Sequence, residues 1–347
     1  MKNTDGEIIE LKGLDERETE EWVSGLGLEK YRARQIRQWL FKKLVSSFDE
    51  MTNLSGSLKN LLGDRAKVTH LEKVRTQVSQ DTTEKYLFRL DDGGHIETVL
   101  IPERDHYTLC VSSQVGCAMG CAFCLTGKQG FKRNLTPAEI IDQVIEVRRS
   151  MASPERLTNI VFMGMGEPLA NYNGVVKAIG NMVAADAMNF SHRRVTLSTC
   201  GLVPFIRRLG GDTTINLAIS LNAADNETRN LLMPVNRQYE IGSLIEACRD
   251  FPLPNRRMIT FEYILINGMN DSPEDARNLA RLLTGLRAKV NLIPFNPFPG
   301  LKMSAPPKEK ILAFQDILVN KHLTAILRKS KGQDISAACG QLSGLEG

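Results

Sequence analysis

The chain is 347 residues long, with 42% hydrophobic and 24% charged residues and a formal net charge of +4. This composition is typical of a globular protein, and the length predicts one large α/β domain with a smaller appendage. No apolar run reaches the length of a membrane span, and the N-terminal stretch MKNTDGEIIELKGLDE is too acidic and polar for a secretory signal. We therefore expect a cytoplasmic protein without a membrane partner, whose mildly basic charge permits an RNA partner.

Residues 1–75 are expected to form a helical N-terminal accessory domain. The hydrophobic pattern identifies no strand in this range. The segment 29–44 has apolar residues near helical spacing, which are Tyr31, Ile36, Trp39, Leu40 and Leu44. Its other face is expected to be basic and to carry Lys30, Arg32, Arg34, Arg37, Lys42 and Lys43. Two interpretations stay open for this face: solvated surface, or a surface that contacts the phosphates of RNA.

Residues 76–105 are expected to form a β-hairpin extension. The runs 85–90 and 95–101 have the composition of strands, and Asp92-Gly93-Gly94 between them is a turn signal. The two strands should pair in antiparallel fashion across this turn.

From residue 106 to about residue 330, strand-like runs alternate with helix-like runs. Several of the strands are apolar on both faces, as in parallel sheets that helices cover on both sides. The predicted strands are 107–113, 159–163, 194–198, 214–220, 259–265 and 288–293. Thr136 and Ser272 look like helix N-caps, each followed by proline. Six βα repeats predict an α/β fold, a partial (β/α)6 barrel whose functional residues lie at the C-terminal ends of the strands. Residues 331–347 form a separate C-terminal segment.

Three of the seven cysteines, Cys117, Cys121 and Cys124, crowd into one C-x3-C-x2-C motif directly after the first predicted barrel strand. Thiolates suit iron–sulfur clusters or zinc. A structural zinc site needs a fourth ligand, which is not nearby in the sequence. Three cysteines on a four-iron cluster leave one iron open to a small molecule. We interpret the motif as a 4Fe-4S site, with structural zinc and unligated buried cysteines as the alternatives.

The motif resembles the C-x3-C-x-aromatic-C signature of radical S-adenosylmethionine (SAM) enzymes, with Phe123 as the aromatic residue. The segment Met163–Pro168, MGMGEP, resembles the glycine-containing SAM-binding motif of the same enzymes. Further segments extend the likeness over the whole chain: CVSSQVGC, QGFKRNL, RRVTLST, NPFPG and AACGQL. The chain is thereby identified as similar to the RlmN/Cfr family of radical SAM RNA adenine methyltransferases.

The resemblance implies roles for three residues outside the cysteine motif. Cys339 matches the cysteine that receives a methyl group from one SAM and passes the carbon on to adenine after a second SAM has supplied a radical. Glu97 matches the residue that accepts the proton from the adenine ring. Cys110 matches the thiol that resolves the protein–RNA adduct by a transient disulfide with Cys339. From the sequence alone, Glu97 would be an exposed strand residue, and either cysteine would be a packing residue.

The resemblance also implies contacts to SAM. They carry over to Gly166, Glu167, Ser198, Ser220, Leu221, Asn222 and Asn296. Many relatives have Ser-Leu-His where this chain has Ser-Leu-Asn at 220–222, so the contact of Asn222 is less well supported, although an amide can still form hydrogen bonds. Cys200 and Cys248 match no functional position, and we expect them to pack in the interior.

The resemblance implies two substrates, which are large-subunit rRNA and, at the adenosine 3′ of the anticodon, some tRNAs. The segments 129–131 and 296–300 look like the form of the family that methylates C2 of adenine. Methylation of C8 is one alternative, and a zinc-stabilised RNA-binding module without catalysis is another. A radical SAM enzyme acting on a protein or small molecule would need neither Cys110 nor Cys339. The resemblance further implies an electron donor such as flavodoxin or ferredoxin, and we expect a monomer. Candidate phosphate contacts near the cysteine motif are Lys128, Lys132 and Arg133, and solvated surface is the alternative for each.

Overall fold

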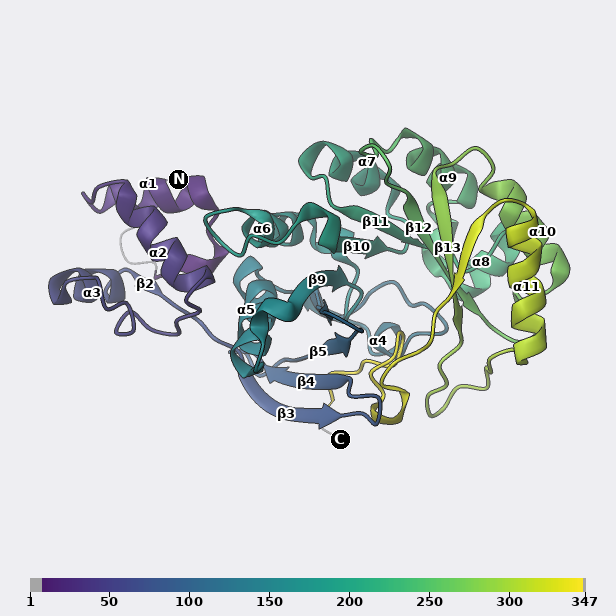
Figure 1. Cartoon of the computed structure of the whole chain (residues 1–347), viewed down its shortest axis with the longest axis horizontal. Coiled ribbons are helices and arrows are strands. Elements are labelled where there is room, and N and C mark those ends of the chain that lie inside the picture. The colour runs from purple at the N-terminus through teal and green to yellow at the C-terminus, as the bar shows by residue number, and fades with distance from the viewer. Residues whose placement is uncertain (1–7, 346–347) are drawn as a thin grey trace.

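The computed structural model describes residues 8–345. Outside the described residues lie 1–7 of the expected N-terminal domain and 346–347 of the expected C-terminal segment. Residues 1–7 are also the first part of the N-terminal stretch that is too polar for a secretory signal. The described chain forms a helical N-terminal region beside a curved sheet with helices packed on it (Figure 1).

The N-terminal region contains three helices, α1 (Glu16–Gly25), α2 (Tyr31–Phe41) and α3 (Gly56–Gly63). It also contains a short parallel pair, β1 (Ile9–Glu10) with β2 (Ala66–Lys67), which the sequence analysis did not predict. Ile36 and Leu40 on α2 are fully buried, as the helical spacing predicts, but Tyr31 is 59% exposed and so does not belong to the apolar face.

Arg37 corrects the expectation of a basic outer face on α2. Its side chain is 1% exposed and forms an ion pair with Asp186, which follows α6 (Tyr172–Val183). The guanidinium also donates to Asn181 on α6, with 3.0 Å between Nη2 and Oδ1. Arg37 therefore holds the N-terminal region against the barrel and is unavailable to a phosphate. The paired carboxylate and amide are distant in sequence, so helical periodicity alone could not reveal this role.

Ten strands of the described chain form one sheet in the order β14-β13-β12-β11-β10-β9-β6-β5-β4-β3. The strands from β6 to β14 pair in parallel, and β3 to β6 pair in antiparallel fashion. The parallel strands are β6 (Tyr107–Cys110), β9 (Leu157–Phe162), β10 (Val195–Thr199), β11 (Asn216–Ser220), β12 (Ile259–Leu265), β13 (Ala288–Pro294) and β14 (Thr324–Leu327). The six predicted barrel strands are confirmed, and β14 extends the parallel part by one strand.

The antiparallel part consists of β3 (Glu72–Val78), β4 (Glu84–Arg89) and β5 (His95–Pro102). β4 and β5 are the predicted hairpin, while β3 was not predicted and pairs with β4 across the expected boundary at residue 75. The division of the chain into four segments stays a prediction.

Helices fill the connections between the parallel strands, as βαβ topology requires. They are α5 (Pro137–Ser150), α6, α7 (Val203–Asp212), α8 (Asn226–Leu232), α9 (Ile241–Asp250), α10 (Pro273–Leu282) and α11 (Lys308–Asn320). α5 begins at the predicted capping box: Glu139 N donates to Thr136 Oγ1 at 3.2 Å, and Thr136 N donates to Glu139 Oε2 at 2.8 Å. Ser272 caps α10 in the same way with Asp275. These caps satisfy backbone donors that the first helical turn leaves unpaired.

The N-terminal region and the barrel share one continuous hydrophobic core. Val23, Ile36 and Leu40 from the N-terminal helices belong to the same cluster of buried side chains as Ile140 of α5 and Leu197 of β10. Burial of apolar surface is the main favourable term in folding, so this shared core ties the two regions together.

Candidate active site

The three motif cysteines lie on a loop held by a small hairpin that the sequence analysis missed. The strands β7 (Gln114–Gly116) and β8 (Phe131–Asn134) pair in antiparallel fashion and enclose the loop together with the short helix α4 (Leu125–Lys128). Cys117 N donates to the Gly130 carbonyl at 2.9 Å. Gly116 has φ +74°, and a Cβ there would lie 1.9 Å from the Gly130 carbonyl oxygen, so the chain needs glycine at the start of this loop.

The three thiols lie close enough to act on one another's charge. Burial raises the pKa of all three thiols, that of Cys117 to about 12, and the thiolates of Cys117 and Cys124 raise the pKa of Cys121 further. Free thiolates would therefore be unfavourable here, and a bound cation would be needed to keep them ionised.

The donor set fits an iron–sulfur cluster. Within residues 8–345, no three His, Cys, Asp or Glu side chains form a group suited to one metal ion. In an iron–sulfur cluster each cysteine binds a different iron, so the thiols need not converge on one point. Three thiols on one loop are soft donors of the kind that bind iron–sulfur clusters.

Cys110 and Cys339, far apart in sequence, lie within each other's electrostatic field. Cys110 ends β6 and is buried, and the Cys339 thiolate contributes to the raised pKa of Cys110. Cys339 is exposed, yet nearby protein atoms raise its pKa to about 11, to which Glu262 and Cys124 also contribute. All seven cysteines are free in the structure, so the disulfide implied by the resemblance is not formed in it.

The C-terminal segment docks directly on the cysteine loop. Leu125 N, which follows Cys124, donates to the Gly340 carbonyl at 2.7 Å, and Thr126 Oγ1 donates to the Leu342 carbonyl at 2.6 Å. Asn296, an expected SAM contact, donates through Nδ2 to the Cys339 carbonyl at 3.2 Å. These bonds place Cys339 beside the motif cysteines.

Glu97 is buried, at 1% exposure, which overturns its interpretation from the sequence alone as an exposed strand residue. Its carboxylate forms an ion pair with Lys85 of β4 at 2.9 Å and accepts hydrogen bonds from Ser343 N at 2.7 Å and Gly344 N at 3.1 Å. Lys85 also donates to the Ser336 carbonyl at 3.3 Å. Glu97 is thus joined to the segment that carries Cys339.

The segment after β9 approaches the cysteine hairpin through its backbone. Gly166 has φ +99°, and a Cβ there would lie 2.5 Å from the Gln114 Cβ. Both oxygens of the Glu167 carboxylate are bonded within the protein, to Cys200 N at 2.8 Å and to Leu169 N at 3.0 Å. This carboxylate therefore ties the segment after β9 to the residue that follows β10, and burial raises its pKa.

The other expected SAM residues lie at or just beyond the ends of β10, β11 and β13. Ser198 and Ser220 face each other, with 3.4 Å between their hydroxyls. Leu221 is fully buried. Asn222 has φ +58° and uses its amide internally: Oδ1 accepts from Ile264 N at 2.8 Å, and Nδ2 donates to the sulfur of Met233. Its side chain therefore stabilises the turn after β11.

Glu262 and Arg229 are charged residues at the site that the sequence analysis missed. Glu262 is paired in register with Ser220 and hydrogen-bonded to Asn291, so it faces the same side of the sheet as the expected SAM residues. A glutamate inside the apolar strand TFEYIL was a signal that could have identified it. Arg229 lies on α8, and the sequence around it gave no comparable indication that it belongs to the site. Cys200 and Cys248 are buried as expected.

The expected phosphate contacts differ in their surroundings. Arg133 forms ion pairs with Asp92 and Glu139, so its charge is already neutralised and it is a poor candidate for RNA. Lys128 lies over the ring of Phe298, 5.2 Å from the centroid, near the cysteine loop. Lys132 is exposed on β8. Lys128 and Lys132 thus stay candidates.

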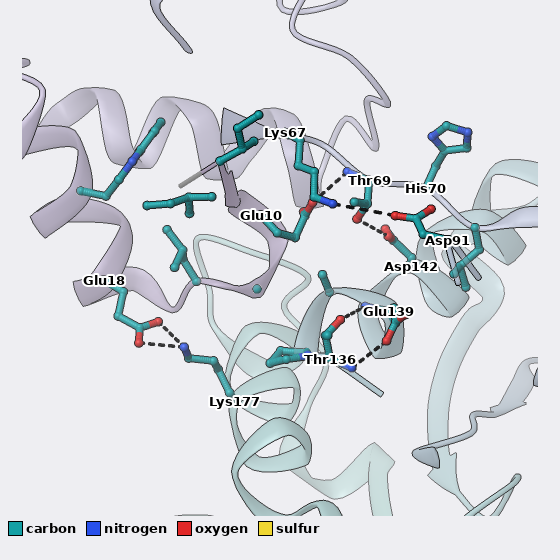
Figure 2. Close-up of a pocket in the computed structure, with 18 of the residues that line it drawn as sticks. Glu10, Glu18, Lys67, Thr69, His70, Asp91, Thr136, Glu139, Asp142 and Lys177 are labelled. Carbon is teal, nitrogen blue, oxygen red and sulfur yellow. Dashed lines mark hydrogen bonds and ion pairs between the residues drawn. The ribbon is translucent and has the colours of Figure 1, made fainter. Parts of the chain in front are cut away.

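A cavity of about 640 Å³ lies between the N-terminal region and the start of α5, away from the cysteine loop. Figure 2 shows Glu18 and Lys177 directed toward each other across it. Asp142, one of its lining residues, forms a buried ion pair with Lys12 and accepts a hydrogen bond from Thr69. Its lining residues come from both regions, so this cavity belongs to the contact between the N-terminal region and the barrel.

Comparison with known proteins identifies the class and then the family. Residues 111–282 match the Radical SAM superfamily, and the barrel with three thiols at its mouth agrees with that class. Residues 9–68 match the ribosomal RNA large subunit methyltransferase N-terminal domain. A crystal structure of a radical SAM methyltransferase from Sphaerobacter thermophilus has a TM-score of 0.92 with 46% identity, covering 97% of this chain and 100% of that one.

Two curated relatives are named dual-specificity RNA methyltransferase RlmN. The one from Desulfosudis oleivorans is 54% identical over 96% of this chain and 90% of its own length. The one from Syntrophus aciditrophicus is 52% identical over 97% of both chains. The chain belongs to the RlmN family of radical SAM RNA methyltransferases. Membership implies a 4Fe-4S cluster and SAM as cofactors.

No helix among residues 8–345 has the length and apolar character needed to cross a bilayer.

Proposed function

We propose that this protein methylates C2 of an adenosine in large-subunit rRNA and of the adenosine 3′ of the anticodon in some tRNAs. The observation that carries the proposal is the gathering of Cys110, Cys339 and the cysteine loop at one end of the barrel, with Glu97 bonded to the segment that carries Cys339. An enzyme that transferred a methyl group directly from SAM would not need this second pair of thiols.

Cys117, Cys121 and Cys124 would hold the cluster, and the backbone around Gly166 together with Ser198 and Ser220 would line the SAM site. When bound, the cluster supplies the electron that cleaves SAM to a 5′-deoxyadenosyl radical. The internal bonds of Glu167 and Asn222 indicate that these two residues shape the SAM site through the backbone.

Cys339, Glu97 and Cys110 would carry out the remaining steps. The Cys339 thiolate attacks the methyl group of a first SAM, forming a sulfur–carbon bond and releasing S-adenosylhomocysteine. This methyl group then loses a hydrogen atom to the 5′-deoxyadenosyl radical, its carbon bonds to the adenine ring, and Glu97 accepts the ring proton. The Cys110 thiolate then attacks the sulfur of Cys339: a sulfur–sulfur bond forms, the sulfur–carbon bond breaks, and the carbon keeps the electron pair and takes up a proton to become the methyl group of the product. The resulting disulfide must be reduced before the next cycle.

The exposure of Cys339 and the burial of Cys110 support this order of events. A thiol that accepts a methyl group from a bound small molecule must be accessible, whereas a resolving thiol needs access only to its partner sulfur. We also propose a cytoplasmic location, where such RNA is modified. An electron donor of the flavodoxin or ferredoxin class and a monomeric state stay predictions.

The test is anaerobic reconstitution with iron and sulfide, followed by incubation with SAM, a reductant and either RNA. Mass spectrometry of the digested RNA should detect adenosine methylated at C2. Methylation at C8 would instead support the alternative assignment. Protein that binds zinc and no iron, and leaves both RNAs unmodified, would contradict the proposal.

A further inference from the structure

Arg229 is a fully buried cation on α8, at 0% exposure. No ion pair with an acidic side chain is found for it within residues 8–345. Its four hydrogen bonds go to neutral oxygens, which belong to Leu221, Asn236, Cys200 and Ser220. Burial without a counter-charge is unfavourable and lowers the pKa of this guanidinium. A negative charge nearby would offset the cost of burying this cation.

The guanidinium is held by backbone carbonyls at the ends of two barrel strands. Nη2 donates to the Cys200 carbonyl, one residue beyond β10, at 2.6 Å and to the Ser220 carbonyl, at the end of β11, at 3.3 Å. Nε donates to the Leu221 carbonyl at 3.0 Å. Arg229 thus joins the two strand ends that carry the expected SAM residues Ser198 and Ser220.

The same helix also supports the cysteine loop. Ala122 N, between two of the motif cysteines, donates to the Leu232 carbonyl of α8 at 2.9 Å. Leu232 packs in one hydrophobic cluster with Phe123 and Cys200. Cys121 and Cys124 pack against the same cluster, and Arg229 Nη2 donates to the Cys200 carbonyl, so the guanidinium lies beside the cysteine loop.

We propose that Arg229 is a positioning residue that fixes the ends of β10 and β11 for SAM and supplies the buried positive charge that offsets the cluster and its thiolates. This inference rests on the proposed ligation by Cys117, Cys121 and Cys124. A buried cation favours the more negative, reduced form of a nearby cluster, so Arg229 raises the reduction potential of the cluster.

The first experiment is a mediated redox titration of the reconstituted full-length enzyme, followed by electron paramagnetic resonance. Arg229→Gln should lower the equilibrium constant for one-electron reduction about tenfold, a shift of about 59 mV to more negative potential. Arg229→Lys keeps the charge and should keep a potential close to that of the wild type, but should bind SAM more weakly because an ammonium cannot reach three carbonyls in the fork geometry of arginine. Arg237→Gln, an exposed position on the following turn, removes the same charge and should leave the potential unchanged.

A second variant keeps the test decisive if Arg229→Gln does not fold. Asn236 accepts from Arg229 Nη1 at 2.9 Å, so Asn236→Asp retains that acceptor while neutralising the cation. It should lower the potential in the same direction. An unchanged potential in Asn236→Asp, or a Lys variant as low in potential as the Gln variant, would overturn the inference. Wild-type enzyme that binds no iron would overturn the proposed cluster instead, so the two failures are distinguishable.

Discussion

At the scale of single residues, the five cysteines at the site have the same side chain but differ in burial and in the element that carries them. Three belong to one loop, Cys110 is buried at a strand end, and Cys339 is accessible on a separate segment. Because thiol reactions depend on access and on the thiolate fraction, these surroundings favour different tasks for each group.

Cys110→Ala should leave the enzyme covalently attached to RNA, because the bond to adenine forms and the thiol that releases it is missing. The measurement is denaturing gel electrophoresis of protein incubated with labelled RNA, SAM and a reductant. Cys248→Ala, which removes a buried thiol on α9, is the matched control and should release its product. Free, fully methylated RNA from the Cys110 variant would rule out its resolving role.

Glu97→Gln should reduce RNA methylation by about 10²–10⁴-fold, the usual contribution of a positioned proton acceptor. Methylation of Cys339 should continue, since that step does not use Glu97. Peptide mass spectrometry and RNA methylation would be measured on the same sample. Glu103→Gln, at an exposed position just beyond β5, controls for loss of charge and should keep full activity. Equal rates in both variants would exclude Glu97 as the base.

At the scale of elements, the β7–β8 hairpin and the C-terminal segment hold the cysteine loop from two sides. The hairpin supplies the tight approach of Gly116 to Gly130, and the C-terminal segment supplies backbone acceptors for Leu125 and Thr126. The geometry of the three thiols therefore depends on both elements.

Gly116→Ala should prevent normal cluster assembly, because its Cβ would meet the Gly130 carbonyl oxygen at 1.9 Å. Iron bound per chain after reconstitution should fall by at least half. Gly130→Ala is a close control: Gly130 has a similar φ of +76°, but a Cβ there would meet nothing within 4 Å. Equal iron content in the two variants would show that the close approach is unimportant.

The contact between the N-terminal region and α5 depends on the Lys12–Asp142 pair, whose side chains are each 1% exposed. Lys12→Met leaves a buried carboxyl without its partner and should lower the free energy of unfolding by about 3 kcal/mol, the lower end of the usual range for breaking a buried pair. The lower end applies because burial raises the pKa of Asp142 to about 7, so the carboxyl can avoid part of the cost by binding a proton.

Urea unfolding would measure this loss, and the double variant Lys12→Met/Asp142→Leu should recover most of it. Arg17→Met removes an exposed pair with Glu21 and should change the stability by less than about 1 kcal/mol. A loss in Lys12→Met no larger than that in Arg17→Met would contradict the structural role of the buried pair.

At the scale of the whole molecule, local sequence signals predicted the architecture well. The apolar runs identified the six barrel strands, and Thr136 and Ser272 marked the starts of two helices, because caps and buried strands are encoded by neighbouring residues. Short or partly exposed strands such as β3 and β14 carry weaker patterns, and they were not predicted.

The positions of charged side chains could not be predicted in the same way. Arg37, Glu97 and Arg133 are each fixed by partners remote in sequence or on another element, so their burial or neutralisation depends on the tertiary fold. The cysteine motif could be recognised, but its support by α8 and the C-terminal segment required the structure. The family resemblance supplied the roles of Cys110, Cys339 and Glu97, which spacing alone does not indicate.

The most direct test of the account is to follow one methyl group from SAM through Cys339 to RNA. Enzyme carrying an isotopically labelled methyl group on Cys339 would be freed of labelled SAM, then given unlabelled SAM, a reductant and RNA for a single turnover. The first methyl group on the adenosine should carry the label. An unlabelled product, with the label still on Cys339, would contradict the role of this thiol as the carrier.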